Sequence, residues 1–181
     1  MPVTTRTQLS ALLLALFAAS LPAIVSADTG PATTLPETRQ LLQVEKNARY
    51  RVVYDIHSDE QAAGISKGLY YARGLFEAFR KQGVEASRVS AHLVLHGDAA
   101  VMLLKDETYQ VAINDAFAIN PNAKIVQDLL DLGVGVEICH SAMKSKGWKF
   151  QDVLPGVTIV HDGYTRLIKL QNDGYAYIGG Y

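Results

Sequence analysis

The segment Gly133–Gly147 reads GVGVEICHSAMKSKG and carries the only cysteine of the chain, Cys139, where a short β-prone run gives way to a helix-prone run. A side chain at the carboxyl end of a strand that faces a helix N-terminus lies near unpaired backbone N–H groups, which favour thiolate over thiol. His140, Lys144 and Lys146 would add positive charge if they fold back over the sulfur. Because free cysteines also pack as small buried hydrophobes, this segment leaves both a reactive and an inert thiol open.

Hydrophobic runs and turn residues on both sides of this segment predict alternating strands and helices. The expected strands cover residues 51–56, 88–96, 135–139, 157–160 and 175–178. The expected helices cover residues 58–82, 99–104, 120–132 and 163–171, with a short one beginning at Ser141. Residues 105–117 are expected to form a surface loop or a subunit contact. Repeated strand and helix in this order predicts a single α/β domain with a parallel sheet and helices on both faces.

Two histidines lie on one face of the strand expected over residues 88–96. His92 and His96 are four positions apart, so both side chains point the same way. A metal site usually takes three or four protein ligands, and no third ligand follows at a fixed spacing, so neither metal nor cofactor is expected. His96 and Gly97 fall at the carboxyl end of the strand, where open α/β sheets place their sites. We therefore count both as candidate site neighbours, with a structural histidine as the alternative.

Four segments, in their order along the chain, resemble the DsrE/DsrF-like sulfur-relay family, which includes the TusD-type subunits. They are Arg51–Ile56, Val94–Ala99, Val136–Gly147 and Leu170–Ile178. The resemblance implies a flavodoxin-like α/β subunit over residues 50–181 that assembles into trimers or hexamers. It also implies a persulfide on the cysteine that Cys139 matches, with a sulfur donor or acceptor protein, or a small sulfane-sulfur compound, as the partner. The candidate site is Cys139 with its neighbours His140, Ser141, His96, Gly97 and Lys144.

The N-terminus is typical of an export signal. Arg6 gives a weakly positive start, Leu9–Leu21 is an apolar run, and Val25-Ser26-Ala27 is a small-residue cleavage pattern. We expect residues 1–27 to be removed and the protein to be periplasmic or secreted. The apolar run is short for a membrane span, so an uncleaved anchor is the less favoured alternative. Residues 28–49 would then form an N-terminal arm with a short helix over residues 34–43.

Charge and cysteine content narrow the function further. The net charge is −1, and it becomes −2 without residues 1–27, which contain Arg6 and no acidic residue. Basic and acidic residues are interspersed, which argues against nucleic acid as a partner, and no membrane contact is expected after signal cleavage. With one cysteine, a disulfide within the subunit is impossible. The thiol must be buried, pair between subunits, bind something or react.

Three functions stay open from the sequence. The first is a sulfur carrier or sulfurtransferase that uses a cysteine persulfide. The second is a non-catalytic oligomeric binding module with a structural cysteine, and the third is a thiol redox sensor, which would form a sulfenate. All three accommodate a homo-oligomer, which we expect because Val101–Leu104, Tyr175 and Tyr177 would expose apolar surface in a monomer.

Overall fold

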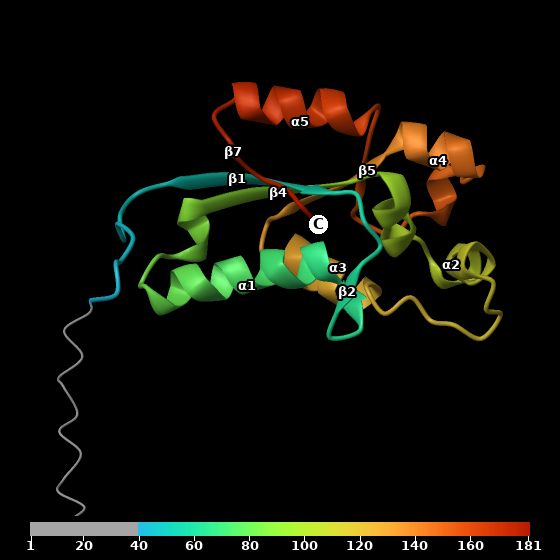
Figure 1. Cartoon of the computed structure of the whole chain (residues 1–181), viewed down its shortest axis with the longest axis horizontal. Helices are drawn as coiled ribbons and strands as arrows, with labels where there is room; N and C mark the ends of the chain where they lie inside the picture. The colour runs from blue at the N-terminus through green and yellow to red at the C-terminus, as the bar shows by residue number, and fades with distance from the viewer. Residues whose placement is uncertain (1–39) are drawn as a thin grey trace, which may run out of the picture. The chain divides into compact units, whose positions relative to one another are not determined.

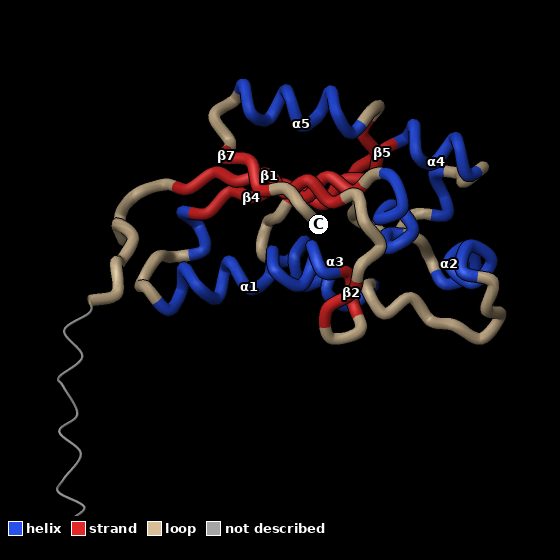
Figure 2. Tube along the Cα trace, in the orientation of Figure 1, coloured by secondary structure: helices blue, strands red, loops and turns tan. Residues whose placement is uncertain are grey.

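The computed structural model describes residues 40–181, which are built around a five-stranded parallel sheet (Figures 1 and 2). The strand order is β6-β5-β4-β1-β7, and every pair in the sheet is parallel. The strands are β1 Tyr50–Ile56, β4 Val89–Leu95, β5 Gly135–Cys139, β6 Thr158–Val160 and β7 Ala176–Ile178. The prediction of a single α/β domain with a flavodoxin-like parallel sheet is confirmed.

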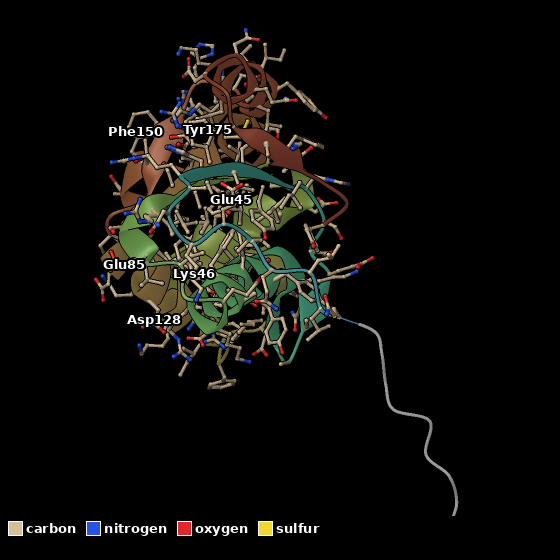
Figure 3. The ribbon with its side chains drawn as sticks, turned by 90° about the vertical axis from the view of Figure 1, so that its left-hand side faces the viewer. Glu45, Lys46, Glu85, Asp128, Phe150 and Tyr175 are labelled. Carbon is tan, nitrogen blue, oxygen red and sulfur yellow. The ribbon has the colours of Figure 1, made fainter. Side chains whose placement is uncertain are left out.

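Helices cover both faces of the sheet. They are α1 Lys67–Lys81, α2 Asp106–Ile113, α3 Ala123–Asp131, α4 His140–Lys146 and α5 Gly163–Asn172. Short 3₁₀ helices are η1 Ala86–Arg88, η2 Gly97–Leu103 and η3 Phe150–Asp152. Figure 1 shows α1 and α3 on one face and α5 on the other. Figure 3 shows the same layers from the side, with Asp128 of α3 and Tyr175 on opposite sides of the sheet.

The two faces of the sheet differ in chemistry. The face under α1 and α3 carries the main hydrophobic cluster, to which Leu93, Leu95 and Ile138 contribute from the strands. The face under α5 has a small apolar cluster of Val53, Val94, Leu167 and Leu170. Side chains alternate between faces along a strand, so the polar residues that share the α5 face are brought together beside this small cluster.

Helix α1 begins later than the sequence predicts. The expected helix over residues 58–82 is replaced at its start by a hairpin of β2 Gln61–Ala62 and β3 Ile65–Ser66. Ala63 and Gly64 turn the hairpin with positive φ values of 52° and 78°, which a helix cannot accommodate. The predicted end is confirmed, because Gly83 follows α1 with a φ of 79°.

Two further expectations differ from the structure. Residues 105–117 are not a loop, because α2 occupies most of this segment, with Asp106 and Glu107 in its first turn. The helix expected over residues 120–132 begins only at Ala123. Asn120 lies before this helix, and its side chain donates hydrogen bonds to the carbonyls of Met102 and Leu104.

The remaining differences concern surface and ends. Met102, Leu103 and Leu104 are buried rather than exposed, and Ile168 of α5 is exposed. Residues 40–49 contain no helix, so the helix expected over residues 34–43 is absent from the described part of its range. The rest of that helix and the expected signal peptide lie outside the described residues. In residues 40–181, no helix is long and apolar enough to cross a membrane.

Candidate functional site

Cys139 lies where the sequence predicts, at the junction of β5 and α4. It is the last residue of the strand and the N-cap residue of the helix. Its side chain makes no capping hydrogen bond to α4. The backbone N–H groups of the following helix, which were expected to face the sulfur, therefore do not bond to it. The backbone N–H of Gly163, the first residue of α5, donates to Sγ at 3.3 Å instead. The donor is thus a backbone N–H at the first turn of α5, where such groups have no partner within their own helix.

The cysteine lines a pocket of about 380 Å³ at the carboxyl ends of β4, β5 and β6. The other lining residues are His96, Gly97, Asp98, Ser141, Ala142, Ser145, Lys146, Asp162, Gly163 and Tyr164. Cys139 itself is only 4% exposed. The sulfur is therefore recessed at the base of an open pocket rather than displayed on the surface.

The structure brings together some of the predicted site residues and leaves others outside. Ser141, His96 and Gly97 share the pocket with Cys139. His140 does not line it, and its ring packs on Phe150 with the centroids 5.1 Å apart.

Of the two lysines that were expected to add positive charge near the sulfur, one lines the pocket and the other does not. Lys144 is exposed and does not line the pocket. Lys146 lines it instead and lies 3.2 Å from the Asp98 carboxylate. Since α4 turns by about 100° per residue, side chains two positions apart on this helix point in different directions. Trp148 lines a neighbouring pocket.

His96 is hydrogen-bonded to a carboxylate on β1, and a tyrosine of β7 holds that carboxylate in turn. His96 Nε2 lies 2.7 Å from Oδ1 of Asp55 on β1, and Tyr177 of β7 donates its hydroxyl to Oδ2 of Asp55 at 2.6 Å. The hydrogen bond to Asp55, together with burial and the carboxylate charge, raises the pKa of Tyr177 to about 12. The phenol therefore stays protonated and donates to Asp55 throughout the physiological pH range.

A second polar cluster lies farther from the pocket on the same face. Arg166 of α5 donates two hydrogen bonds of 2.7 Å to the Glu137 carboxylate, and His92 Nδ1 lies 2.6 Å from Glu137 Oε1. Burial raises the pKa of Glu137, but the hydrogen bonds and charges of Arg166 and His92 outweigh it and leave the pKa below its usual value. Glu137 is two positions before Cys139, so both clusters lie under α5.

Asp55, Tyr177, Glu137 and Arg166 are missed by the sequence reasoning. The strands that carry Asp55, His96 and Tyr177 are far apart in the sequence, and only the register of β1 with β4 and β7 joins them. A signal does exist for Glu137, because a carboxylate within a strand expected to be buried requires a cation or donor nearby. Within residues 40–181, no group of three or more His, Cys, Asp or Glu side chains is placed to hold a metal ion.

Comparisons with known proteins agree with this architecture. The family model described as "DsrE/DsrF-like family" matches residues 62–179. The solved structure of the protein of unknown function MTH1491 from Methanobacterium thermoautotrophicum is similar with a TM-score of 0.56 and 22% identity, covering 72% of this chain and 99% of that one. A search of curated proteins found no match. Because the family model spans more than half of the chain, including the cysteine pocket, the chain belongs to the DsrE/DsrF-like family.

Proposed function

We propose that this protein is a sulfur carrier or sulfurtransferase that holds sulfane sulfur as a persulfide on Cys139. One observation carries the proposal: the only cysteine of the chain accepts a backbone N–H from Gly163 inside a pocket at the carboxyl edge of the sheet. A thiolate is the form that attacks sulfur, and backbone N–H groups at a helix N-terminus are the kind of donor that stabilises a thiolate. Membership of the family, whose resemblance implies sulfur relay, supports the same reading.

The chemistry needs only a donor that carries sulfane sulfur. The Cys139 thiolate attacks the outer sulfur of a donor persulfide, a new S–S bond forms at Sγ, and the donor S–S bond breaks. The donor leaves as a thiolate, so no external oxidant or reductant is consumed. Transfer onward is the same step in reverse, with an acceptor thiolate attacking the outer sulfur on Cys139.

Intact-mass spectrometry after incubation with polysulfide tests this proposal. The wild-type protein is expected to gain mass in multiples of one sulfur atom, and dithiothreitol should remove the gain. Cys139→Ser should fold but gain nothing, because a hydroxyl is a poor nucleophile without an activating base. Sulfur on the serine variant would contradict the assignment to Cys139, and a wild-type protein that stays unloaded would contradict the proposed function.

The low exposure of Cys139 favours a second candidate, a non-catalytic module in which the cysteine is structural. Alkylation separates the two candidates. A carrier thiol should react with iodoacetamide in the folded protein, whereas a structural thiol should react only after denaturant is added. A redox sensor would instead form a sulfenate with peroxide and take up no sulfur from polysulfide.

The proposal includes export and self-association. Residues 1–27 have the composition of a cleaved signal, so mature protein from the periplasm or the medium should begin at or near Asp28. Exposed apolar side chains on α2 and the segment after it, namely Val111, Phe117 and Ile119, support a homo-oligomer. The trimer or hexamer implied by the family resemblance is the expected assembly.

A further inference from the structure

The carboxyl edge of the sheet holds a chain of three hydrogen-bonded side chains that ends beside the cysteine. Asp55 accepts from Tyr177 with one oxygen and contacts His96 Nε2 with the other. Asp55 and His96 are both buried. An ionised carboxylate only accepts hydrogen bonds, so the His96 nitrogen that faces it carries the proton. In the neutral imidazole this leaves Nδ1 as the acceptor.

The second ring nitrogen of His96, Nδ1, is not fully buried and is unpaired within the described residues. His96 Nδ1 has no hydrogen-bond partner within residues 40–181, and in that part of the chain Ser66 Oγ is the one fully buried side-chain N or O atom without a partner. Nδ1 is therefore not sealed in the core. The imidazole ring lines the cysteine pocket, so a proton can reach the ring from the pocket.

His96 and Cys139 are also neighbours across the sheet. Strands β4 and β5 pair in parallel up to Leu95 and Ile138, so the next residue of each strand is His96 and Cys139. Gly163 contacts both residues. Its N–H donates to the sulfur, and a Cβ on this glycine would lie 3.1 Å from the Cβ of His96.

We propose that His96 is the proton acceptor for the Cys139 thiol, and that Asp55 and Tyr177 are positioning residues that fix its tautomer. The inference rests on the proposed function. It assigns a role to His96, which the sequence leaves open as either a site neighbour or a structural histidine. Nδ1 takes the thiol proton, the thiolate attacks the outer sulfur of the donor persulfide, and the donor S–S bond breaks. The departing donor thiolate then takes the proton from His96, which restores the neutral imidazole.

Other ionisable groups lie near His96 and Cys139, and their effect on the thiol must be distinguished from that of His96. Lys146 is paired with Asp98, the Asp162 side chain accepts the N–H of Thr165, and the rings of Tyr164 and His57 lie 5.0 and 6.0 Å from that of His96. Lys146 is the remaining cation of the pocket. It could stabilise a thiolate through its charge but carries no unshared pair to accept the thiol proton while it is protonated, whereas a neutral imidazole does.

The test is the rate of Cys139 alkylation by iodoacetamide against pH, which does not depend on sulfur transfer. His96→Gln is expected to lower the rate by about tenfold or more near pH 6.5, because the thiolate then loses the imidazolium partner that forms when Nδ1 takes the proton. The deficit should shrink toward alkaline pH, where any thiol ionises. Asp55→Asn should shift the profile in the same direction by a smaller factor.

His140→Gln is the matched control. This histidine directly follows Cys139 in the sequence but packs on Phe150 outside the pocket, so its profile should follow that of the wild type. A His96→Gln profile that also overlays the wild type would overturn the proposal. If His96→Gln does not fold, the near-isosteric Asp55→Asn decides the matter, and an unchanged profile there would overturn it equally.

The two proposals fail in different ways. If polysulfide loads no sulfur while alkylation still depends on His96, the proposed function is wrong and the proton acceptor stands. If sulfur loads normally while alkylation ignores His96, the reverse holds. A folded wild-type protein that is not alkylated at any pH would overturn both.

Discussion

Glu137 is a carboxylate held inside the sheet, and its neighbours explain why a charge is tolerated there. The residue is 2% exposed, and Arg166 and His92 together occupy both of its oxygens. Taking a charge out of water costs several kcal/mol, which a partner of good geometry offsets. Removal of Arg166 would thus leave the Glu137 carboxylate buried without its cation.

Arg166→Met should therefore destabilise the fold strongly. The free energy of unfolding is expected to fall by about 3 kcal/mol, the lower end of the range for breaking a buried ion pair. Lys169→Met is the control on the same helix, since Lys169 pairs with Asp173 at the exposed surface, and it should change stability by less than about 0.5 kcal/mol. Urea denaturation of both variants measures the difference, and equal effects would contradict the assignment.

The acid limb of the stability curve gives an independent check. The folded-state pKa of Glu137 lies below its ordinary value of 4.5, so its contribution is present above that ordinary value and is lost as pH falls through the folded-state value. Arg166→Met removes the largest of the interactions that lower the pKa. Stability of this variant should thus fall less steeply with acid below about pH 4.5 than that of the wild type.

At the scale of elements, α5 links the two polar clusters. Its first residue, Gly163, reaches the cysteine sulfur, Arg166 one turn later reaches Glu137, and Leu167 and Leu170 pack on Val53 and Val94 between them. The hydrogen bond to Cys139 thus depends on where a whole helix docks. Packing of α5 and the reactivity of the thiol are consequently coupled.

Helix α1 provides a matched pair of glycines with opposite environments. A Cβ at Gly68 would lie 2.7 Å from side-chain atoms of the fully buried Ile56, whereas nothing lies within 4 Å of a Cβ at Gly74. Gly68→Ala should lower the free energy of unfolding by about 1–3 kcal/mol through overpacking. Gly74→Ala should raise it by roughly 0.5–1 kcal/mol, because alanine is the better helix former. Thermal denaturation should give shifts of opposite sign, and a stabilising Gly68→Ala would contradict the close packing of α1 on β1.

For the whole molecule, local patterns in the sequence predict the sheet and the cysteine junction, but not the contacts made across strands. The run that ends in Cys139 is apolar apart from Glu137 and follows the helix stop Gly133, so the local pattern is enough to predict a strand there. The turn at Ala63 uses a positive φ in a residue other than glycine, and nothing in its identity signals this. Asp55 and Tyr177 meet His96 only through strand register, which no local pattern encodes.

Exposed apolar side chains on and after α2 bear on whether the protein self-associates. Phe117 is 94% exposed and Val111 is 81% exposed, and both lie on α2 or the segment directly after it. Burying an aromatic side chain of this size contributes about 1.5–3 kcal/mol relative to leaving it in water. A subunit interface over α2 would recover this energy for every copy in the assembly.

Light scattering at micromolar concentration should accordingly find more than one chain per particle. Phe117→Asp should reduce the particle to a monomer, because a carboxylate at an apolar interface loses its hydration without gaining a partner. Ile168→Asp is the control, since Ile168 is also exposed but lies on α5, away from α2 in the sequence and in the fold (Figure 1); it should leave the particle size unchanged. A monomeric wild type would contradict the assembly altogether, whereas dissociation by Ile168→Asp and not by Phe117→Asp would move the interface to the α5 face, where it would cover Tyr164 at the mouth of the cysteine pocket.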